Sequence, residues 1–167
     1  MTQNHSESDD EARRSRPSTE ASYGIPERED GMLPWTFVEE KMRTDQRYWV
    51  TTICPDGVPH ARPTWGVWVD GTFYCGGGER TRWVRNLSRN SDIVIHREDA
   101  EEVVIIEGTA SRLDAETGDS ALVERIDAAY EEKYDIDHGT PFFGVRPDVV
   151  FAWSEYPTDA TRWTFSE

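Results

Sequence analysis

The short strand-like segments in the first half of the chain, and the turns between them, constrain its fold most. Residues 48–53 are rich in aromatic and β-branched side chains and end at the Pro55-Asp56-Gly57 turn. Residues 59–69 form a second predicted strand, and the Asp70-Gly71 pair then predicts a two-residue hairpin into residues 72–75. Strands joined in this way build an antiparallel sheet. Helices do not alternate with them, so a parallel βαβ sheet is disfavoured.

Four later segments have the same character and predict further strands: residues 92–96, 103–113, 148–153 and 161–165. Gly108 is a candidate bulge within the second of them. The sum is six or seven short antiparallel strands. Closure of such a sheet into a barrel would remove its exposed edges, so a barrel is the expected architecture.

Three helices are inserted between these strands. The first is predicted to begin at Pro34, because apolar residues then follow at helical spacing. The second covers residues 82–88, with Thr81 as its cap. The third covers residues 119–134, with Asp119 or Ser120 as its cap.

The chain is strongly acidic. Aspartate and glutamate number 33 against 18 lysines and arginines, which gives a net charge of -15 at pH 7. Such a field repels nucleic acids and anionic membranes, so neither is expected as a partner. Only Lys41 and Lys133 are lysines. An acid-rich, lysine-poor surface is typical of proteins from salt-loving organisms, and a halophilic protein is favoured over an acidic mesophilic one.

The first 30 residues differ from the rest. They are rich in acids, have only Tyr23 and Ile25 as apolar anchors, and are predicted to be a disordered acidic tail, residues 1–30, ahead of one domain, residues 31–167. No window approaches the roughly 20 apolar residues of a membrane span, and no apolar signal region is present, so a cytoplasmic location is expected. The cysteines are expected to be reduced core thiols, and the histidines show no metal-ligand spacing.

The segment GGGERTRWVRNLSR, residues 76–89, concentrates glycine and arginine. Arg80, Arg82, Arg85 and Arg89 lie beside a single acid, Glu79. Glycines allow close approach of a ligand, free N–H groups at a helix start attract an anion, and arginine binds phosphate in a bidentate fashion. These features predict a phosphate cradle; the alternative is a solvated helix whose arginines pair with acids. Neither a Walker A nor a GxGxxG motif occurs, which argues against a nucleoside triphosphate or Rossmann site.

The segment HARPTWGVW, residues 60–68, predicts a strand that could contact a ring. Pro63 cannot donate in a ladder, so the strand is irregular or at a sheet edge there. Its freed backbone beside Arg62 and Thr64 could bind a planar heterocycle, with Trp65 or Trp68 stacked on it. The alternative places both tryptophans in the core and Arg62 at the surface.

The order of four segments resembles the pyridoxamine 5'-phosphate oxidase-like family: PDGVPHARPTW, TFYCGGGERTRWVRNL, DIVIHRE and VVIIEGTASRL. The likeness is strong over residues 47–113 and weaker up to residue 153. Members of that family are split β-barrels that bind flavin mononucleotide (FMN) or, in some branches, the deazaflavin coenzyme factor-420. The resemblance therefore implies a mainly β fold with helices, a split β-barrel of the FMN-binding type.

The resemblance also implies where a cofactor binds. In the family, the strand after the first turn lines the flavin ring, and the loop entering the next helix holds the phosphate. The ring positions correspond to Arg62, Pro63, Thr64 and Trp65. The phosphate positions correspond to Cys75, Gly76, Thr81 and Arg82, with Arg85 and Asn86 close behind. A homodimer is implied as well, with the cofactors in two clefts between the subunits.

Two departures from the family pattern bear on the substrate. Trp83 stands where many members carry a lysine beside the phosphate-binding arginine. The chain ends in ATRWTFSE, which does not match the arginine-containing motif that grips the substrate phosphate in a true pyridoxamine phosphate oxidase. Vitamin B6 oxidation is therefore not expected.

The resemblance implies an oxidoreductase that transfers a hydride between a bound flavin or deazaflavin and a small organic substrate. No catalytic side chain and no metal is assigned, because the cofactor carries such chemistry. The alternative is a flavin- or haem-binding module without turnover. A ligand-free interaction barrel is the third reading, and it would leave the arginine cluster without a role.

Overall fold

The structure is a computed structural model that describes residues 12–166 of the 167-residue chain. Strands and helices of these residues have the following bounds: β1 Ala12–Ser15, a 3-10 helix Ala21–Tyr23, α1 Trp35–Thr44, β2 Tyr48–Ile53, β3 Pro59–Thr64, β4 Val67–Val69, β5 Thr72–Gly76, α2 Arg82–Leu87, β6 Asp92–Arg97, β7 Val103–Leu113, α3 Ser120–Tyr134, β8 Phe142–Trp153 and β9 Thr161–Phe165.

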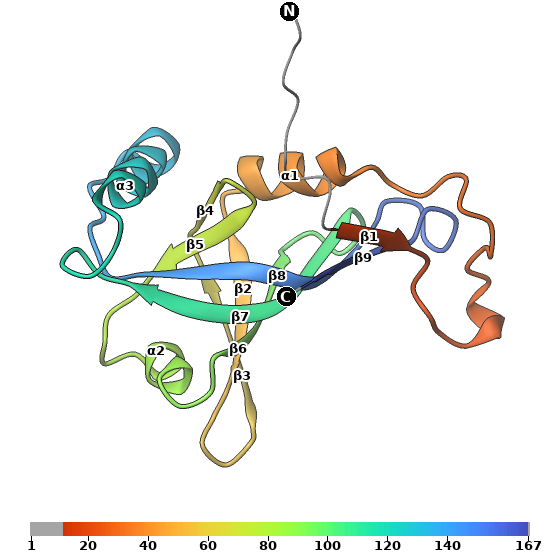
Figure 1. Ribbon diagram of the computed structural model, residues 1–167. Coiled ribbons are helices and arrows are strands. Elements are labelled where there is room, and N and C mark those ends of the chain that lie inside the picture. The colour runs from red at the N-terminus through yellow and green to blue at the C-terminus, as the bar shows by residue number, and fades with distance from the viewer. Residues whose placement is uncertain (1–11, 167) are drawn as a thin grey trace, which may run out of the picture.

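All strands belong to one antiparallel sheet, with the order β1-β9-β8-β7-β6-β2-β3. The long strand β8 also pairs with β5 through its first half, and β4 extends the sheet beyond β5. No ladder among the described residues joins β3 to β4, so the curled sheet stays open. Figure 1 shows this arrangement, with α1 and α3 above the β7–β8 ribbon and α2 below it. The predicted fold class, a mainly β split barrel with helices, is confirmed.

Local sequence signals predicted most elements correctly. The bounds of β2, β7 and β9 match the predicted strands, and the Asp70-Gly71 turn joins β4 to β5 with positive φ at both residues. The β7–β8 register shifts between Glu107 and Gly108, which confirms the bulge. The side chain of Asp119 accepts hydrogen bonds from two backbone N–H groups of α3, as expected of its cap.

Two strand predictions are corrected. Residues 59–69 are not one strand, because the ladder stops at Thr64 and resumes at Val67. Together with the additional β1, this break raises the strand number from the predicted six or seven to nine in the described part of the chain. The last long strand begins at Phe142 rather than at residue 148. Its Pro147 lies opposite Gly108 at the bulge, where a missing donor is tolerated.

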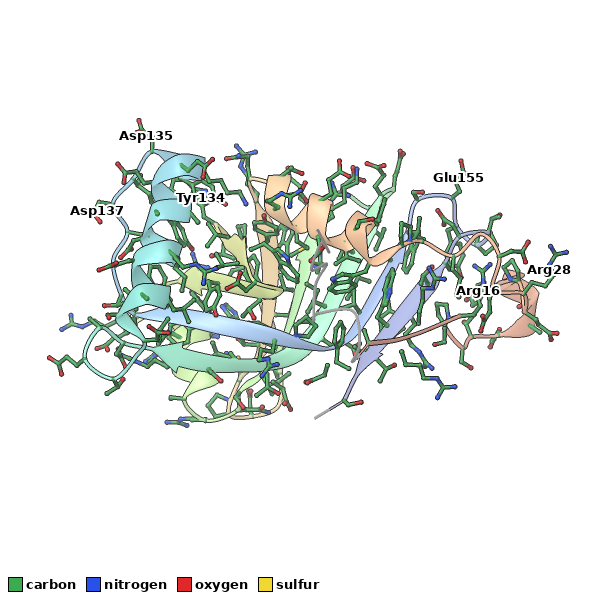
Figure 2. All side chains as sticks on the ribbon, turned by 45° about the horizontal axis from the view of Figure 1, so that its top comes forward. Arg16, Arg28, Tyr134, Asp135, Asp137 and Glu155 are labelled. Carbon is green, nitrogen blue, oxygen red and sulfur yellow. The ribbon has the colours of Figure 1, made fainter. Side chains whose placement is uncertain are left out.

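The structure describes part of the predicted tail. Residues 1–11 lie outside the described part, and β1 pairs with β9, which is far away in the sequence. The guanidinium group of Arg16 donates to the carbonyl oxygens of Arg28, Asp30, Thr158 and Ala160 at 2.8–3.0 Å. Figure 2 shows Arg16 and Arg28 at this end of the molecule. The division into a disordered tail, residues 1–30, and a domain, residues 31–167, stays a prediction.

Two clusters of buried side chains form the core. The larger one fills the inside of the curled sheet and is closed by α1 and α2, with Val38, Met42, Tyr48 and Phe73 among its members. The smaller one lies under α3 and consists of Val67, Ile126, Tyr130 and Phe142. No helix of residues 12–166 is both long and apolar enough to cross a membrane.

Candidate functional site

The short helix α2 presents its arginines to solvent. Trp83, Val84 and Leu87 are buried and hold the helix against the barrel, whereas Arg82 and Arg85 are exposed. Among the described residues, the side chains of Arg80, Arg82, Arg85 and Arg89 form no ion pair and no hydrogen bond. The described part of the chain therefore does not show the alternative, in which these arginines pair with nearby acids. Their charges remain available to an anion.

Packing accounts for two of the three glycines before α2. A Cβ atom on Gly76 would lie 2.0 Å from Cε1 of His138, and one on Gly77 would lie 2.3 Å from Cζ2 of Trp83. These glycines therefore make room for two rings of the protein itself. Only Gly78 has open space around it, with its nearest neighbour, the Thr81 methyl group, at 3.9 Å. The Thr81 hydroxyl donates to the Gly78 carbonyl at 2.7 Å instead of capping α2.

Cys75 and Asn86, both predicted cofactor residues, have buried side chains. Burial raises the pKa of the Cys75 thiol to about 12, so the thiol stays protonated at neutral pH. The Asn86 amide donates to the Thr52 hydroxyl at 3.0 Å and points toward the Cys54 sulfur at 3.6 Å. Asn86 therefore ties α2 to β2.

We expect Asn86→Ala to lower the free energy of unfolding by about 2 kcal/mol, because a buried hydrogen bond is lost and Thr52 loses its partner. Affinity of the folded protein for FMN should stay unchanged. Urea denaturation and an FMN titration measure the two effects. Asn90→Ala is the matched control, since the Asn90 side chain accepts one bond from Asp92 at the exposed surface. A large loss of affinity in Asn86→Ala alone would show that its side chain reaches the ligand.

The register of β3 brings two of the predicted ring-binding residues, Arg62 and Thr64, to the same side of the sheet as α2. Arg62 and Thr64 lie opposite Val50 and Tyr48 of β2, and directly paired residues share one face. Thr52, two positions along from Val50, is the residue that Asn86 of α2 binds. Arg62 is exposed, and its one hydrogen bond among the described residues is a 3.4 Å contact with the Pro63 carbonyl. We call these two elements, with Arg62, Thr64, Arg82 and Arg85, the β3–α2 edge.

The two candidate stacking residues, Trp65 and Trp68, lie in different surroundings. Trp68 packs toward the main core, with its ring centroid 6.4 Å from that of Trp35. Trp65 is 48% exposed and stacks on Tyr134 of α3, with centroids 4.7 Å apart and ring planes 5° from parallel. Only the opposite face of the Trp65 indole is therefore open to a ligand. Pro63, on the edge strand as predicted, is exposed beside it.

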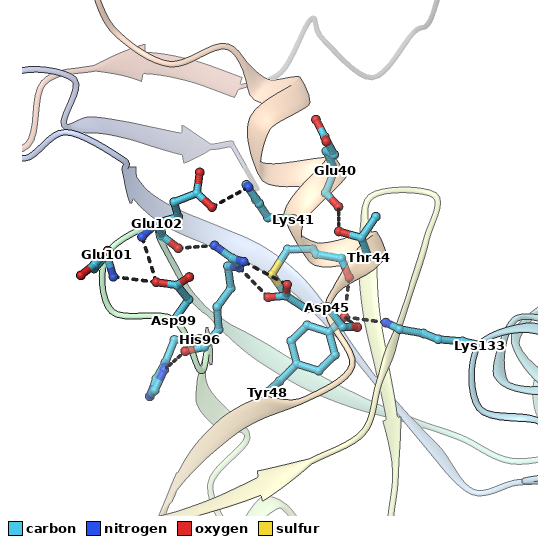
Figure 3. A network of polar contacts seen from close by, with 12 residues as sticks. Glu40, Lys41, Thr44, Asp45, Tyr48, His96, Asp99, Glu101, Glu102 and Lys133 are labelled. Atoms are coloured by element: carbon cyan, nitrogen blue, oxygen red, sulfur yellow. Dashed lines mark hydrogen bonds and ion pairs between the residues drawn. The ribbon is translucent and has the colours of Figure 1, made fainter.

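Residues of α3 that were not predicted from the sequence contact this region. Lys133 Nζ donates to the Gly66 carbonyl at 2.9 Å and to the Tyr48 hydroxyl at 2.6 Å. Figure 3 shows Lys133 reaching from α3 to Tyr48. Burial lowers the pKa of Lys133 to about 8, and the nearby Asp45 opposes this effect. A signal was present, since this is one of only two lysines among many arginines.

Stability should rise with pH between about 8 and 10 because of Lys133. Its pKa in the folded protein lies below the ordinary 10.5, so the unfolded chain binds more protons in this window. The unfavourable burial of charge is fully present below pH 8 and is relieved as the amine deprotonates. Urea denaturation across this range should show a rise on the order of 1 kcal/mol, discounted for the partial exposure of the amine.

Lys133→Met should abolish this rise, whereas Lys41→Met should keep it, because the partly buried pair of Lys41 with Glu102 does not include Lys133. Equal pH profiles for Lys133→Met and the unchanged protein would contradict the assignment.

The predicted site residues do not enclose a cavity in the single chain. A groove of about 1280 Å³ lies between α1, the β4–β5 turn, the middle of β7 and β8 and the end of β9, and apart from the candidate stacking residue Trp68 none of those residues lines it. A smaller cavity of about 300 Å³ beside α2 includes Arg85 but no other predicted site residue. The β3–α2 edge is therefore an open surface. Within residues 12–166, no group of three or more side chains is arranged to hold a metal.

Comparison with known proteins gives a consistent result. Residues 36–154 match the family model described as pyridoxamine 5'-phosphate oxidase. Among curated protein sequences, none matches the chain.

Three solved structures illustrate the shared fold. An F420 reductase is 17% identical with a TM-score of 0.53, over 71% of this chain and 98% of that one. A FAD-binding protein from Mesorhizobium loti is 13% identical with a TM-score of 0.58, over 81% and 96%. The haem storage protein HutZ from Vibrio cholerae is 17% identical with a TM-score of 0.56, over 72% and 94%. Identities this low show a common fold and nothing finer.

Proposed function

The chain belongs to the pyridoxamine 5'-phosphate oxidase family, and from this we propose that it binds a flavin or deazaflavin nucleotide at the β3–α2 edge and acts as an oxidoreductase. The observation that carries the proposal is the set of unpaired arginines on and beside α2. In a chain of net charge -15, four neighbouring arginines without acidic partners among the described residues are a strong local exception. One guanidinium group can bind two oxygens of a phosphate at the same time, and it keeps its positive charge at any physiological pH.

The neighbouring strand suits the planar part of such a ligand. β3 is the last strand of the sheet path and pairs with β2 alone, so its outer backbone groups are free among the described residues. Arg62 and Thr64 project on the α2 side, and Trp65 offers one ring face. A bound flavin or deazaflavin supplies the ring that accepts or gives the hydride. The protein then has to bind and orient the cofactor and the substrate, and this role requires no acidic or basic side chain of the protein.

A homodimer is part of the proposal, and the outer face of the sheet supports it. A row of partly or fully exposed side chains crosses five strands in register: Pro63, Trp49, His96, Ile105 and Phe151. Apart from His96 at its centre this row is apolar, and grouped apolar side chains on a surface are typical of protein interfaces. The row ends at β3, so a second copy bound there would border the open edge and enclose the cofactor. We do not include nucleic acids or membranes among the partners, because the acidic surface repels both.

The substrate is proposed to be a small organic molecule other than pyridoxamine phosphate. The carboxy-terminal arginine, Arg162, lies within β9, where its Nε is 3.3 Å from the hydroxyl of Ser15 in β1. It is engaged on the outer strands of the sheet, away from β3 in the strand order. Arg162 is therefore not placed to bind a ligand phosphate at the β3–α2 edge of the same chain.

The test is a titration of the purified protein in high salt with FMN, factor-420 and haem, each followed by its absorption spectrum. Saturable one-to-one binding of FMN or factor-420 is expected. Reduction of the bound cofactor and reoxidation by added acceptors then distinguishes an enzyme from a binding module. Binding of haem alone would replace the flavin proposal by the haem-binding alternative, and binding of none of the three would overturn both. Sedimentation analysis tests the dimer separately.

A further inference from the structure

The gap between β3 and β4 is held by the end of α3. Gly66 occupies this gap, and both of its peptide groups are bound by α3 side chains. Its carbonyl accepts from Lys133 Nζ at 2.9 Å, and its N–H donates to the Tyr134 hydroxyl at 3.0 Å. The hydroxyl also lies 2.9 Å from the carbonyls of Gly66 and Gln46 and can donate to one of them at a time. Lys133 and Tyr134, which are consecutive in α3, thus both bind Gly66, which lies 67 residues before Lys133 in the chain.

The opposite side of Gly66 is closed as well. A Cβ atom at this position would lie 2.1 Å from Cζ of Phe73. The Phe73 ring is fully buried and packs edge-on against Tyr48, with centroids 4.8 Å apart. Gly66 is therefore confined between the core on one side and α3 on the other, and the conformation of the gap depends on both.

The same α3 residues contact the ring segment directly. Tyr134 stacks on the inner face of Trp65, which precedes Gly66. The amine of Lys133 also reaches Tyr48, whose hydroxyl donates to the carbonyl of Met42 or Asp45 at the end of α1. The end of α3, the end of α1 and the β3–β4 gap therefore form one connected set of contacts, seen in part in Figure 3. We call Lys133 and Tyr134 with these contacts the α3 latch.

The latch is independent of the arginines on α2. None of its bonds involves α2, and its residues belong to α3 and the gap at Gly66. A change in the latch can therefore alter the ring segment without altering the phosphate-binding charges. Tyr134 and Lys133 hold Trp65 and Gly66 through contacts within the protein itself, and preorganisation of this kind reduces the ordering cost of binding.

We infer that Lys133 and Tyr134 are positioning residues that hold the Thr64–Gly66 segment in the conformation that receives the ring of the cofactor. The inference rests on the proposed function for its ligand. The inference extends the proposed function, because it assigns part of the affinity for the cofactor to α3, a helix that contributes no predicted cofactor residue. The latch acts through Trp65 and the backbone of Gly66.

The experiment compares Tyr134→Phe, Lys133→Met and the double variant in the full-length protein. Tyr134→Phe removes the hydroxyl and keeps the ring on Trp65. Tyr156→Phe is the matched control for the tyrosine, because the Tyr156 ring also contacts a tryptophan, Trp153, at 5.2 Å. Lys41→Met controls for the lysine. The readouts are hydrogen exchange of the Gly66 amide without ligand and the affinity for FMN and factor-420 at a temperature where every variant is folded.

Exchange of the Gly66 amide is expected to be about tenfold faster in Tyr134→Phe, because its hydrogen-bond acceptor is gone. The double variant should bind the cofactor about tenfold more weakly, with both controls unchanged. A purely structural role would lower the denaturation midpoint and leave the affinity of the folded protein as it was, and that result would overturn the inference. Unchanged exchange at Gly66 would overturn it too.

If the proposed function is wrong, the experiment gives a result that differs from failure of the latch. In that case the unchanged protein binds neither FMN nor factor-420, and the assignment of a cofactor to the latch is overturned with it. Faster exchange at Gly66 in Tyr134→Phe would then still show that α3 holds the gap. Binding by the unchanged protein with equal affinity in the double variant would contradict the latch alone.

Discussion

Replacing both Arg82 and Arg85 by alanine is expected to lower the affinity for FMN or factor-420 about a hundredfold. Each charge-assisted contact to a phosphate contributes about 1.5–3 kcal/mol, and a tenfold change in affinity corresponds to about 1.4 kcal/mol. We take the lower end of that range for each residue because both side chains are exposed. The free energy of unfolding should change by less than about 0.5 kcal/mol, because neither side chain has a partner among the described residues.

The matched control for this variant is Arg43→Ala. Arg43 is an exposed arginine of α1 and lines the large groove rather than the β3–α2 edge. It removes one positive charge from the same acidic chain, where the double variant removes two, so a general electrostatic effect would cost the control about half as much binding free energy. Normal affinity in the double variant would refute the phosphate cradle. A loss in the control of about half the double variant's binding free energy would assign the effect to net charge instead of a site.

Asp45→Ala should cost the largest share of stability of any single change considered for this chain, about 3 kcal/mol. Asp45 forms a two-bond ion pair with the guanidinium group of Arg97, whose side chain is only 8% exposed. Figure 3 shows Asp45 at the end of α1. Removal of the carboxylate leaves a buried charge with a single remaining bond to the Glu102 carbonyl. Breaking a buried pair in this way typically costs about 3–5 kcal/mol, and the partial exposure of Asp45 sets the lower end.

Asp30→Ala is the control, because its ion pair with Arg28 is exposed to solvent and such pairs contribute about 0–1 kcal/mol. Chemical denaturation measures both variants. Addition of Arg97→Met to Asp45→Ala should restore much of the loss, since the unpaired charge is then gone. Similar losses in Asp30→Ala and Asp45→Ala would contradict the special role of the buried pair.

Features governed by neighbours in the sequence could be predicted. The Asp119 cap and the Asp70-Gly71 turn depend on a few consecutive residues, and the structure contains both. The exposed arginines of α2 were found for the same reason, because helical spacing decides which side chains share a face. Local patterns predicted only a sheet closed into a barrel, and the family resemblance added the prediction that the barrel is split.

Features governed by distant partners could not be predicted. The segment ARRS looks like part of a polar tail and becomes β1 only because β9 is available to pair with it. Gly76 and Gly77 suggested an open loop for a ligand, yet His138 and Trp83 fill the space above them. The break at Gly66 likewise requires Phe73 on one side and α3 on the other. No local pattern contains this information, because each contact is made by residues far apart in the chain.

The pairing of β1 with β9 has a consequence for synthesis of the chain on the ribosome. β1 emerges long before its partner β9, since Arg16 and its acceptor Thr158 are separated by 142 positions. The edge of β1 must therefore wait unpaired until β9 has been made. Its two arginines, Arg13 and Arg14, suit this interval, because charged edges resist pairing with other nascent chains. Pairing of β9 with β1 is then a late event of maturation, since contacts of long sequence separation form slowly.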